Sequence, residues 1–253
     1  MSSLTRSGPR RDVRAAAPGR PGVGVPGCAH PLLAPAEWTA LTRPHTPLDW
    51  AVLDVARGPG ALPDPRCLEA AGRLRNGGVR VLGLLDLGHG TRPFGEIVRD
   101  ARRFTEWYRT DGFYLRRCPG RYAALDGVRR LADALVALRQ DAHLVLEHGL
   151  HPDPGFAEIP GCQLVTFAGP WAEYRWSQAP EWTAEYPPER FCHLVHCLPR
   201  GHLEQALRTA RWLGAGTVYF TDRTDRGDAG GPWEALPGYW DEFVSRIGTR
   251  VSE

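Results

Sequence analysis

Short apolar runs alternate with longer amphipathic segments along most of this chain. The runs are bounded by Gly, Pro and Asp and are rich in Val and Leu, as strands buried on both faces of a parallel sheet are. This pattern predicts strands at 29–34, 48–55, 79–86, 111–116, 142–147, 162–167, 191–197 and 217–221.

The segments between these runs repeat apolar residues at helical spacing. After the third predicted strand, Ile97, Ala101 and Phe104 fall on one face of a helix, while Arg99 and Arg102 fall on the other. Helices are predicted at 36–43, 64–76, 94–109, 122–140, 171–184, 202–213 and 233–246, with only a turn or two at 153–159. Strands that alternate with helices in this way predict an α/β fold, a single (β/α)8 barrel of the TIM type.

The length of 253 residues suits one such barrel as a single domain. We place it at residues 28–248 and interpret residues 1–27 as a disordered tail rich in Arg, Gly and Pro. The tail has no aromatic residue and little apolar surface to offset the entropy of ordering. Its charges are five arginines against one acid: Arg6, Arg10, Arg11, Arg14, Arg20 and Asp12.

Charge and hydropathy exclude several partners. The net charge is +2 and the barrel region carries no broad basic field, so we expect no nucleic acid partner. No apolar run is long enough to span a bilayer, and the first residues lack the apolar core of a secretory signal. We therefore expect a cytoplasmic protein with no membrane partner; the sequence does not indicate an oligomeric state.

The six cysteines are scattered, and we interpret them as reduced core thiols. A zinc site is an alternative near 192–202, where cysteines and histidines are close together. On a strand, however, Cys192 and His196 face one side while His193 and Cys197 face the other. We therefore predict no metal and no cofactor.

In a (β/α)8 barrel, the carboxyl ends of the strands and the loops after them form the functional face. One acid at a strand end commonly caps a helix or a loop, but acids at several strand ends favour a shared polar pocket. The residues at the predicted ends are Asp54, Asp86, Arg116, Arg117, Glu147, His148, Ala168, His196 and Asp222.

Several separated segments resemble, in order, spherulation-specific family 4, the spherulin-4-like proteins. They lie between about Cys28 and Val244: His30–Pro35 with Trp38, Gly58–Gly60, Val81–Arg92, Asp111–Tyr114, Val218–Asp222 and Leu236–Trp240. The most specific is Gly-His-Gly-Thr-Arg at 88–92, close to the Gly-Tyr-Gly-Thr-Arg of the family. The resemblance implies a barrel related to glycoside hydrolases that act on galactosamine-containing polysaccharide.

The chain departs from the family at positions that matter for catalysis. The fourth strand of the family ends in Asp-Glu, and Arg116 and Arg117 align there; the sixth typically ends in Glu, where this chain has Ala168. Arginine has no acceptor and stays protonated, so it cannot act as base or nucleophile. Two other positions gain acids, because Asp54 and Glu147 replace family asparagines.

We interpret the new acids as charge compensation, with Glu147 neutralising Arg116. Arg92 is expected to clamp its loop by pairing with Asp86 or Asp54. These inferences predict a catalytically degenerate barrel, a pseudoenzyme, that keeps a pocket for a saccharide or a small anionic ligand. The predicted pocket residues are Arg92, Arg116, Arg117, His89, His148, Ala168, His196 and Asp222.

Two alternatives remain. The first is an active glycoside hydrolase of amino-sugar polysaccharide that uses Asp54, Asp86 and Glu147 as relocated acids. The second is a barrel that binds a partner protein through the arginine pair and the loop 223–228.

Overall fold

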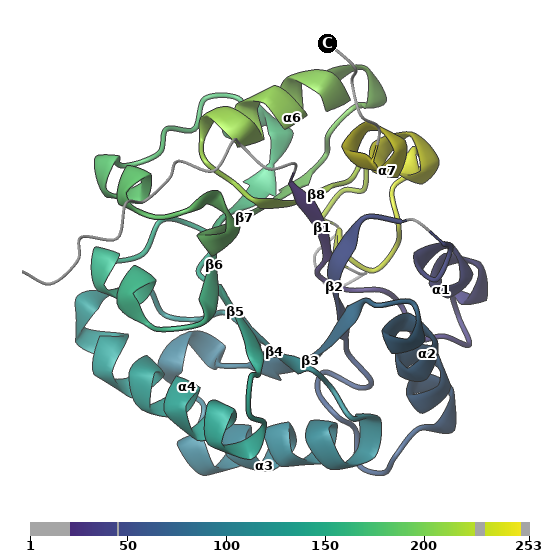
Figure 1. The fold of residues 1–253 in the computed structure, drawn as a ribbon, viewed down its shortest axis with the longest axis vertical. Coiled ribbons are helices and arrows are strands. Elements are labelled where there is room, and N and C mark those ends of the chain that lie inside the picture. Colours follow the sequence, from purple (N-terminus) through teal and green to yellow (C-terminus); the bar gives the residue numbers. More distant parts are fainter. Residues whose placement is uncertain (1–20, 45, 226–230, 249–253) are drawn as a thin grey trace, which may run out of the picture.

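A computed structural model describes residues 21–44, 46–225 and 231–248, and its eight parallel strands close into a barrel (Figure 1). The strands follow one another around the barrel in chain order, and β1 pairs with β8 to close it. Their bounds are β1 Gly22–Val25, β2 Leu48–Leu53, β3 Arg80–Asp86, β4 Gly112–Arg116, β5 His143–Glu147, β6 Cys162–Pro170, β7 Phe191–His196 and β8 Thr217–Phe220. The predicted (β/α)8 barrel is confirmed.

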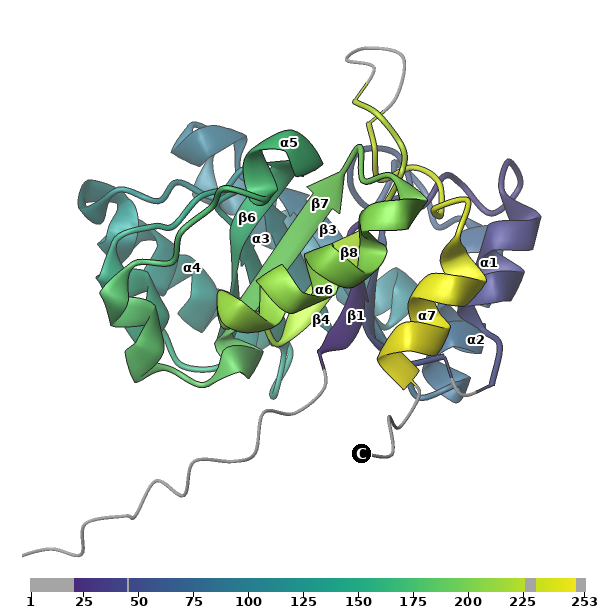
Figure 2. The ribbon, with the colours of Figure 1, turned by 90° about the horizontal axis from the view of Figure 1, so that it is seen from above.

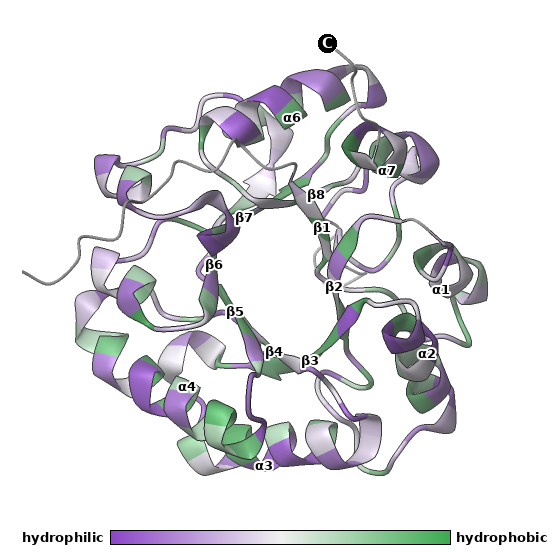
Figure 3. Cartoon of the chain, in the orientation of Figure 1, coloured by the Kyte–Doolittle hydropathy of each residue, from purple (hydrophilic) through white to green (hydrophobic). Residues whose placement is uncertain are grey.

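Helices form the outer layer, with apolar positions turned to the strands and polar positions outward (Figure 3). Their bounds are α1 Pro35–Leu41, α2 Pro65–Asn76, α3 Phe94–Arg103, α4 Leu125–Leu138, α5 Trp171–Tyr174, α6 Leu203–Trp212 and α7 Trp240–Gly248. Short turns of other helical types are η1 Gly88–Gly90, η2 Phe104–Tyr108, η3 Tyr122–Ala124, η4 Pro154–Glu158, η5 Glu181–Glu185, η6 Pro188–Arg190 and η7 Arg200–His202. No described helix has the length and apolar character needed to cross a membrane.

The prediction of the first strand was wrong. The strand is Gly22–Val25, within the predicted tail, and residues 29–34 form the connection to α1. Glycine weakens strand propensity, but the Trp50 ring lies so close to Gly24 that a Cβ there would collide with it. The predicted boundary at residue 28 therefore falls after β1, while residues 1–20 of the predicted tail lie outside the described residues.

Two predicted helices are also much shorter than expected. The segment 171–184 is helical only as far as Tyr174, followed by turns that include Pro180, and the last helix starts at Trp240 rather than 233. Aromatic residues at helical spacing produced the long predictions. Proline lacks the N–H that a continuing helix needs, and Pro180 and Pro237 interrupt both segments.

Side chains that cross the barrel interior establish which strand positions point inward. The Trp50 and Tyr114 rings lie 5.8 Å apart although β2 and β4 are not neighbours. Trp50 Nε1 also donates to Gln163 Oε1 of β6, at 2.8 Å. Because strand side chains alternate, Arg116, two residues after Tyr114, also points inward, at the carboxyl ends that face upward in Figure 2.

Candidate functional site

Three charged residues form one layer at the carboxyl end of the barrel. Asp86 on β3 is paired in register with Arg116 on β4. Tyr114 on β4 is paired with Val145 on β5, and Arg116 and Glu147 each come two residues later on these strands. Glu147 therefore lies beside Arg116 on the next strand and points to the same side. The layer consists of an acid, an arginine and a second acid on three neighbouring strands.

Asp86 is the centre of this layer. Its Oδ2 accepts hydrogen bonds from Arg116 Nη2 at 2.8 Å and Arg117 Nη2 at 2.6 Å, and its Oδ1 accepts from Arg117 Nε at 2.8 Å and the Gly88 amide at 2.9 Å. Burial alone would raise the pKa of Asp86, but the hydrogen bonds from Arg117 and Arg116 outweigh it and lower the pKa to about 2. The carboxylate is ionised at neutral pH and its acceptor positions are occupied.

Arg117 reaches this layer only because the backbone turns at its Cα. Simple alternation would direct the Arg117 side chain away from the interior, but β4 ends at Arg116 and Arg117 has a φ of 54°. This left-handed conformation is unfavourable for a side chain with a Cβ. The turn lets the guanidinium bind Asp86 with two nitrogens, in the fork geometry suited to carboxylates.

Glu147 differs from Asp86 because its desolvation is not outweighed by hydrogen bonds. Burial raises the pKa of the Glu147 carboxyl to about 7, against the lowering effects of the Arg117 amide, Arg116 and the Tyr114 hydroxyl. The Arg117 amide donates to Glu147 Oε2 at 3.4 Å. Glu147 can therefore exist in both protonation states near neutral pH, unlike Asp86.

The neutralising partner of Arg116 is therefore Asp86, not the predicted Glu147. Asp86 is held in place by the Gly88 amide and is fully ionised, whereas burial keeps Glu147 partly protonated. Asp54 belongs to the same part of the mouth, and its Oδ1 accepts a hydrogen bond from the Gly58 amide at 2.8 Å. Burial raises the pKa of Asp54 more than this hydrogen bond and the charge of Arg116 lower it.

Arg92 clamps its loop, but to a different carboxylate from those predicted. Its guanidinium forms an ion pair with Asp100 of α3 and lies 3.6 Å from Glu96, and it donates to the backbone carbonyl of Asp86 at 3.3 Å. Arg92 lies just before the start of α3, so the pair ties the loop to the helix that follows it. Arg92 therefore holds the β3–α3 loop instead of binding at the mouth.

Two predicted pocket histidines lie away from the charged layer. His89 is exposed in η1, with a φ of 56°, and its amide donates to the Arg117 carbonyl at 3.0 Å. His148 points outward from β5, packs on Phe156 and lies 3.3 Å from the Cys118 carbonyl through Nδ1. Burial lowers the pKa of His148 to about 4, so the ring is neutral.

The remaining predicted residues lie on the other half of the mouth. Ala168 is paired with Leu194 on the inward side of β6, so an acid at 168 would face the interior. His196 also points inward and lies beside Trp233, with ring centroids 5.7 Å apart. Asp222 instead anchors its loop, because its Oδ1 accepts from the Gly238 amide at 3.0 Å.

The cysteine and histidine residues at β7 follow the predicted alternation only within the strand. Cys197 comes just after it with a φ of 54°, and its Sγ lies 3.2 Å from His196 Nδ1, although the two were predicted to face opposite sides. His193 lies on the outer side between the Tyr174 hydroxyl, at 2.8 Å, and the Thr166 hydroxyl, at 3.1 Å, while His196 faces inward. Within the described residues, a different trio brings metal-binding atoms within 4.8 Å: His30, Asp64 and Cys67.

This trio acts as a clamp at the start of α2. Asp64 caps the helix with Oδ1 through the amides of Arg66 and Cys67, and its Oδ2 lies 3.2 Å from His30 Nε2. The Leu32 amide donates to His30 Nδ1, which leaves the proton of the neutral ring on Nε2 and directs it to Asp64. A metal on Nε2 would require the opposite tautomer, so the hydrogen bonds favour a structural role.

Sequence reasoning missed Tyr114, which is buried beneath the charged layer and whose hydroxyl lowers the pKa of Glu147. The signal was its position two residues before Arg116 on the same strand.

The loop 223–228, predicted as a protein-binding surface, lies partly outside the described residues, which end at 225 and resume at 231.

Comparisons with known proteins identify the relationships of the chain. A family model described as spherulation-specific family 4 matches residues 23–247. The crystal structure of Aspergillus clavatus Sph3 in complex with GalNAc is similar in fold, with a TM-score of 0.78 and 22% sequence identity, and covers 91% of this chain and 98% of that one. A truncated 3-deoxy-D-arabino-heptulosonate 7-phosphate synthase from Thermotoga maritima is more distant, with a TM-score of 0.49, 11% identity and coverage of 93% and 89%. A search of curated proteins found no match.

Proposed function

Because the chain belongs to spherulation-specific family 4, we propose that it is a glycoside-hydrolase-type barrel that no longer cleaves its polysaccharide and binds a saccharide with an anionic group. The observation that carries this proposal is the occupation of Asp86 by Arg116 and Arg117. These arginines stand where the resemblance to the family implies the catalytic Asp-Glu pair.

Loss of hydrolysis follows from what the charged layer can do. Glycosidases of the usual kind need one carboxyl group to protonate the leaving oxygen and a second to act as nucleophile or base. Asp86 has a pKa of about 2 and accepts four hydrogen bonds, so it is a poor acid and a hindered nucleophile. Ala168, on the facing half of the mouth, supplies no acid.

The same layer suits an anionic ligand. Two arginines face the ionised Asp86, and Glu147, with a pKa of about 7, adds only part of a negative charge. The third acid near Arg116 is Asp54, whose pKa is raised by burial. The Arg117 side chain is 50% exposed, and Arg116 Nε is buried without a partner among the described residues. Guanidinium groups bind carboxylates and phosphates through paired hydrogen bonds. The GalNAc complex of Sph3 supports a sugar as the body of the ligand.

Calorimetric titration with an oligogalacturonide and with a neutral galacto-oligosaccharide of equal length tests this proposal. We expect the charged sugar to bind more tightly, and Arg117→Gln to weaken it about tenfold, as the loss of a charge-assisted hydrogen bond does. Arg139→Gln is the matched control, because Arg139 pairs with Asp111 before the start of β4, at the opposite end of the barrel. Failure of both sugars to bind would overturn the proposal.

An active hydrolase is the second candidate, and Glu147 is the observation that favours it. A partly buried carboxyl with a pKa of about 7 resembles a general acid poised for neutral pH. In this case the protein would release reducing ends from a galactosamine-containing polysaccharide, and Glu147→Gln would abolish the release. If the native chain is inactive and the triple change Arg116→Asp, Arg117→Glu and Ala168→Glu restores cleavage, degeneracy is supported instead.

A further inference from the structure

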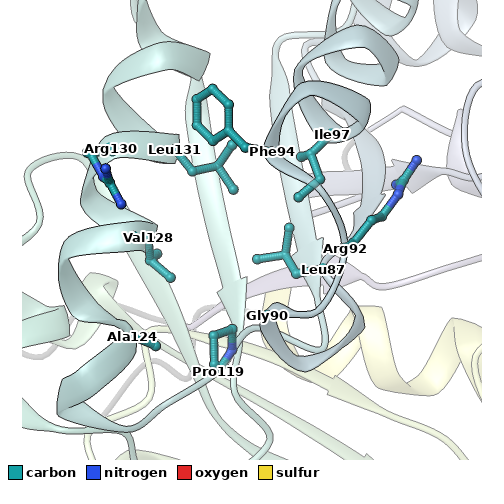
Figure 4. A pocket seen from close by; sticks show the side chains of 11 residues that line it. Leu87, Gly90, Arg92, Phe94, Ile97, Pro119, Ala124, Val128, Arg130 and Leu131 are labelled. Carbon is teal, nitrogen blue, oxygen red and sulfur yellow. The ribbon is translucent and has the colours of Figure 1, made fainter.

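A cavity between α3 and α4 lies outside the barrel mouth and has no role in the function proposed above (Figure 4). Its volume is about 570 Å³, within the range of roughly 300–1,000 Å³ that small-molecule sites occupy. The buried side chains of Leu87, Ile97, Val128 and Leu131 form its floor. Phe94, half exposed, stands on its rim.

Two arginines line this apolar cavity, and only one of them is available to a ligand. The Arg92 guanidinium is engaged by Asp100 and Glu96. The exposed Arg130 side chain, on α4, has no ion pair or side-chain hydrogen bond with any residue in the described part of the chain. A cation at the edge of an apolar hollow complements a molecule with an apolar body and one negative charge.

A glycine keeps the cavity open. Gly127 lies in the first turn of α4 and lines the cavity, and a Cβ built on it would meet no atom within 4 Å. Glycine is unfavourable in a helix compared with alanine, and no neighbouring atom requires it here. Any larger residue at 127 would extend into the space between the two helices.

We propose that this cavity is a binding site for a small amphipathic carboxylate, with the apolar body between α3 and α4 and the carboxylate on Arg130. The site is independent of the saccharide site. The two share only the adjacent loops, through Leu87 next to Asp86 and Pro119 two residues after Arg117.

Calorimetry on the full chain with decanoate, and with decanol as its neutral match, tests the proposal. We expect decanoate to bind, and Gly127→Leu to weaken binding at least tenfold by filling the cavity. Gly95→Leu is the matched control: Gly95 is also an exposed helical glycine whose added Cβ meets nothing within 4 Å, but it does not line the cavity. Both changes should raise helix stability alike, so thermal unfolding will reveal any failure to fold.

A second pair of variants tests the role of the charge. Arg130→Gln should weaken decanoate binding about tenfold and leave decanol unchanged, since it removes only the contact with the carboxylate. Arg129→Gln, at the neighbouring position where the side chain pairs with Glu158, should change neither. The proposal would be overturned if the affinity for decanoate were unchanged by Gly127→Leu, or unchanged by Arg130→Gln. Loss of decanoate binding in Arg117→Gln would overturn it as well, by placing the ligand at the barrel mouth.

Discussion

The two halves of the barrel mouth differ in the side chains that they direct inward. On β2 to β5, the strand ends carry Asp54, Asp86, Arg116 and Glu147, which influence one another's charge. On β6 and β7, the inward positions are Ala168 and His196. Among the described strand ends, the inward carboxyls therefore come from β2 to β5, while on the other half Glu173 of α5 and Asp225 act on His196 through their charges.

The central acid of the charged half, Asp86, is already bound by other groups of the protein. Each oxygen of Asp86 already accepts two hydrogen bonds, so the acid holds the arginines in place more than it faces a ligand. A catalytic pair requires two carboxyl groups with different protonation states and free access to the same bond. Here the protonation states differ, but the ionised carboxyl is enclosed by guanidinium groups. The contrast supports a binding role for the mouth over a hydrolytic one.

The largest expected effect concerns the protonation of Glu147. Its folded pKa of about 7 lies above its ordinary value of 4.5, so the folded state retains a proton that the unfolded state releases in this window. The unfolding free energy of the native chain should therefore fall by about 3 kcal/mol between pH 4.5 and 7.5 relative to Glu147→Gln. Urea unfolding across this range measures the difference.

The exposed Glu158→Gln, which changes a surface pair with Arg129, is the control for replacing a glutamate. A difference between the native chain and Glu147→Gln that stays constant with pH would mean that the folded pKa of Glu147 is close to its ordinary value, so that the carboxyl is ionised at neutral pH. It would then share with Asp86 the neutralisation of the arginine pair, and the net positive charge proposed for the ligand site would be lost.

The next largest effect is expected on the free energy of unfolding when Asp86, which pairs with both arginines, is replaced. Asp86→Asn would remove the carboxylate that pairs with both Arg116 and Arg117. We expect a loss of about 2 kcal/mol, less than for a fully buried pair because both arginines are partly exposed. Asp222→Asn, which weakens one loop hydrogen bond, should lose less than about 1 kcal/mol. The lowered pKa of Asp86 makes its contribution present above about pH 4 and absent near pH 2, so the Asp86 variant and the native chain should converge in acid.

The sequence predicted the barrel because its strands are apolar runs of ordinary strand composition. It missed β1, where Gly24 is required by the Trp50 ring of the neighbouring strand β2. Such a contact between two separate segments leaves no local pattern. The long helices predicted at 171–184 and 233–246 failed for a local reason, since the prolines outweighed the aromatic spacing.

The charged layer was predictable in part. Parallel strands in register bring their carboxyl ends together, and this rule placed Asp86, Arg116 and Glu147 near one another. The partner of Arg116 was not predictable, because it depends on the burial that leaves Glu147 partly protonated. The direction of Arg117 depends on a left-handed φ, which an arginine adopts only when the surrounding structure imposes it.

That left-handed arginine gives the smallest and sharpest test of the charged half. Arg117 and Arg109 share the conformation, with φ of 54° and 53°, but only the Arg117 side chain binds Asp86. Glycine at either position relieves similar strain, so Arg109→Gly should stabilise the fold by about 0.5 kcal/mol after its entropic cost. Arg117→Gly should be about 1 kcal/mol less favourable than Arg109→Gly, since it also loses a half-exposed ion pair.

Equal stabilisation of the two variants in urea unfolding would mean that the pair with Asp86 contributes nothing to folding. The pair would then not offset the strain of the left-handed backbone at Arg117. The charged half of the mouth would differ from the other half in its residues, but this ion pair would add nothing to the free energy of unfolding.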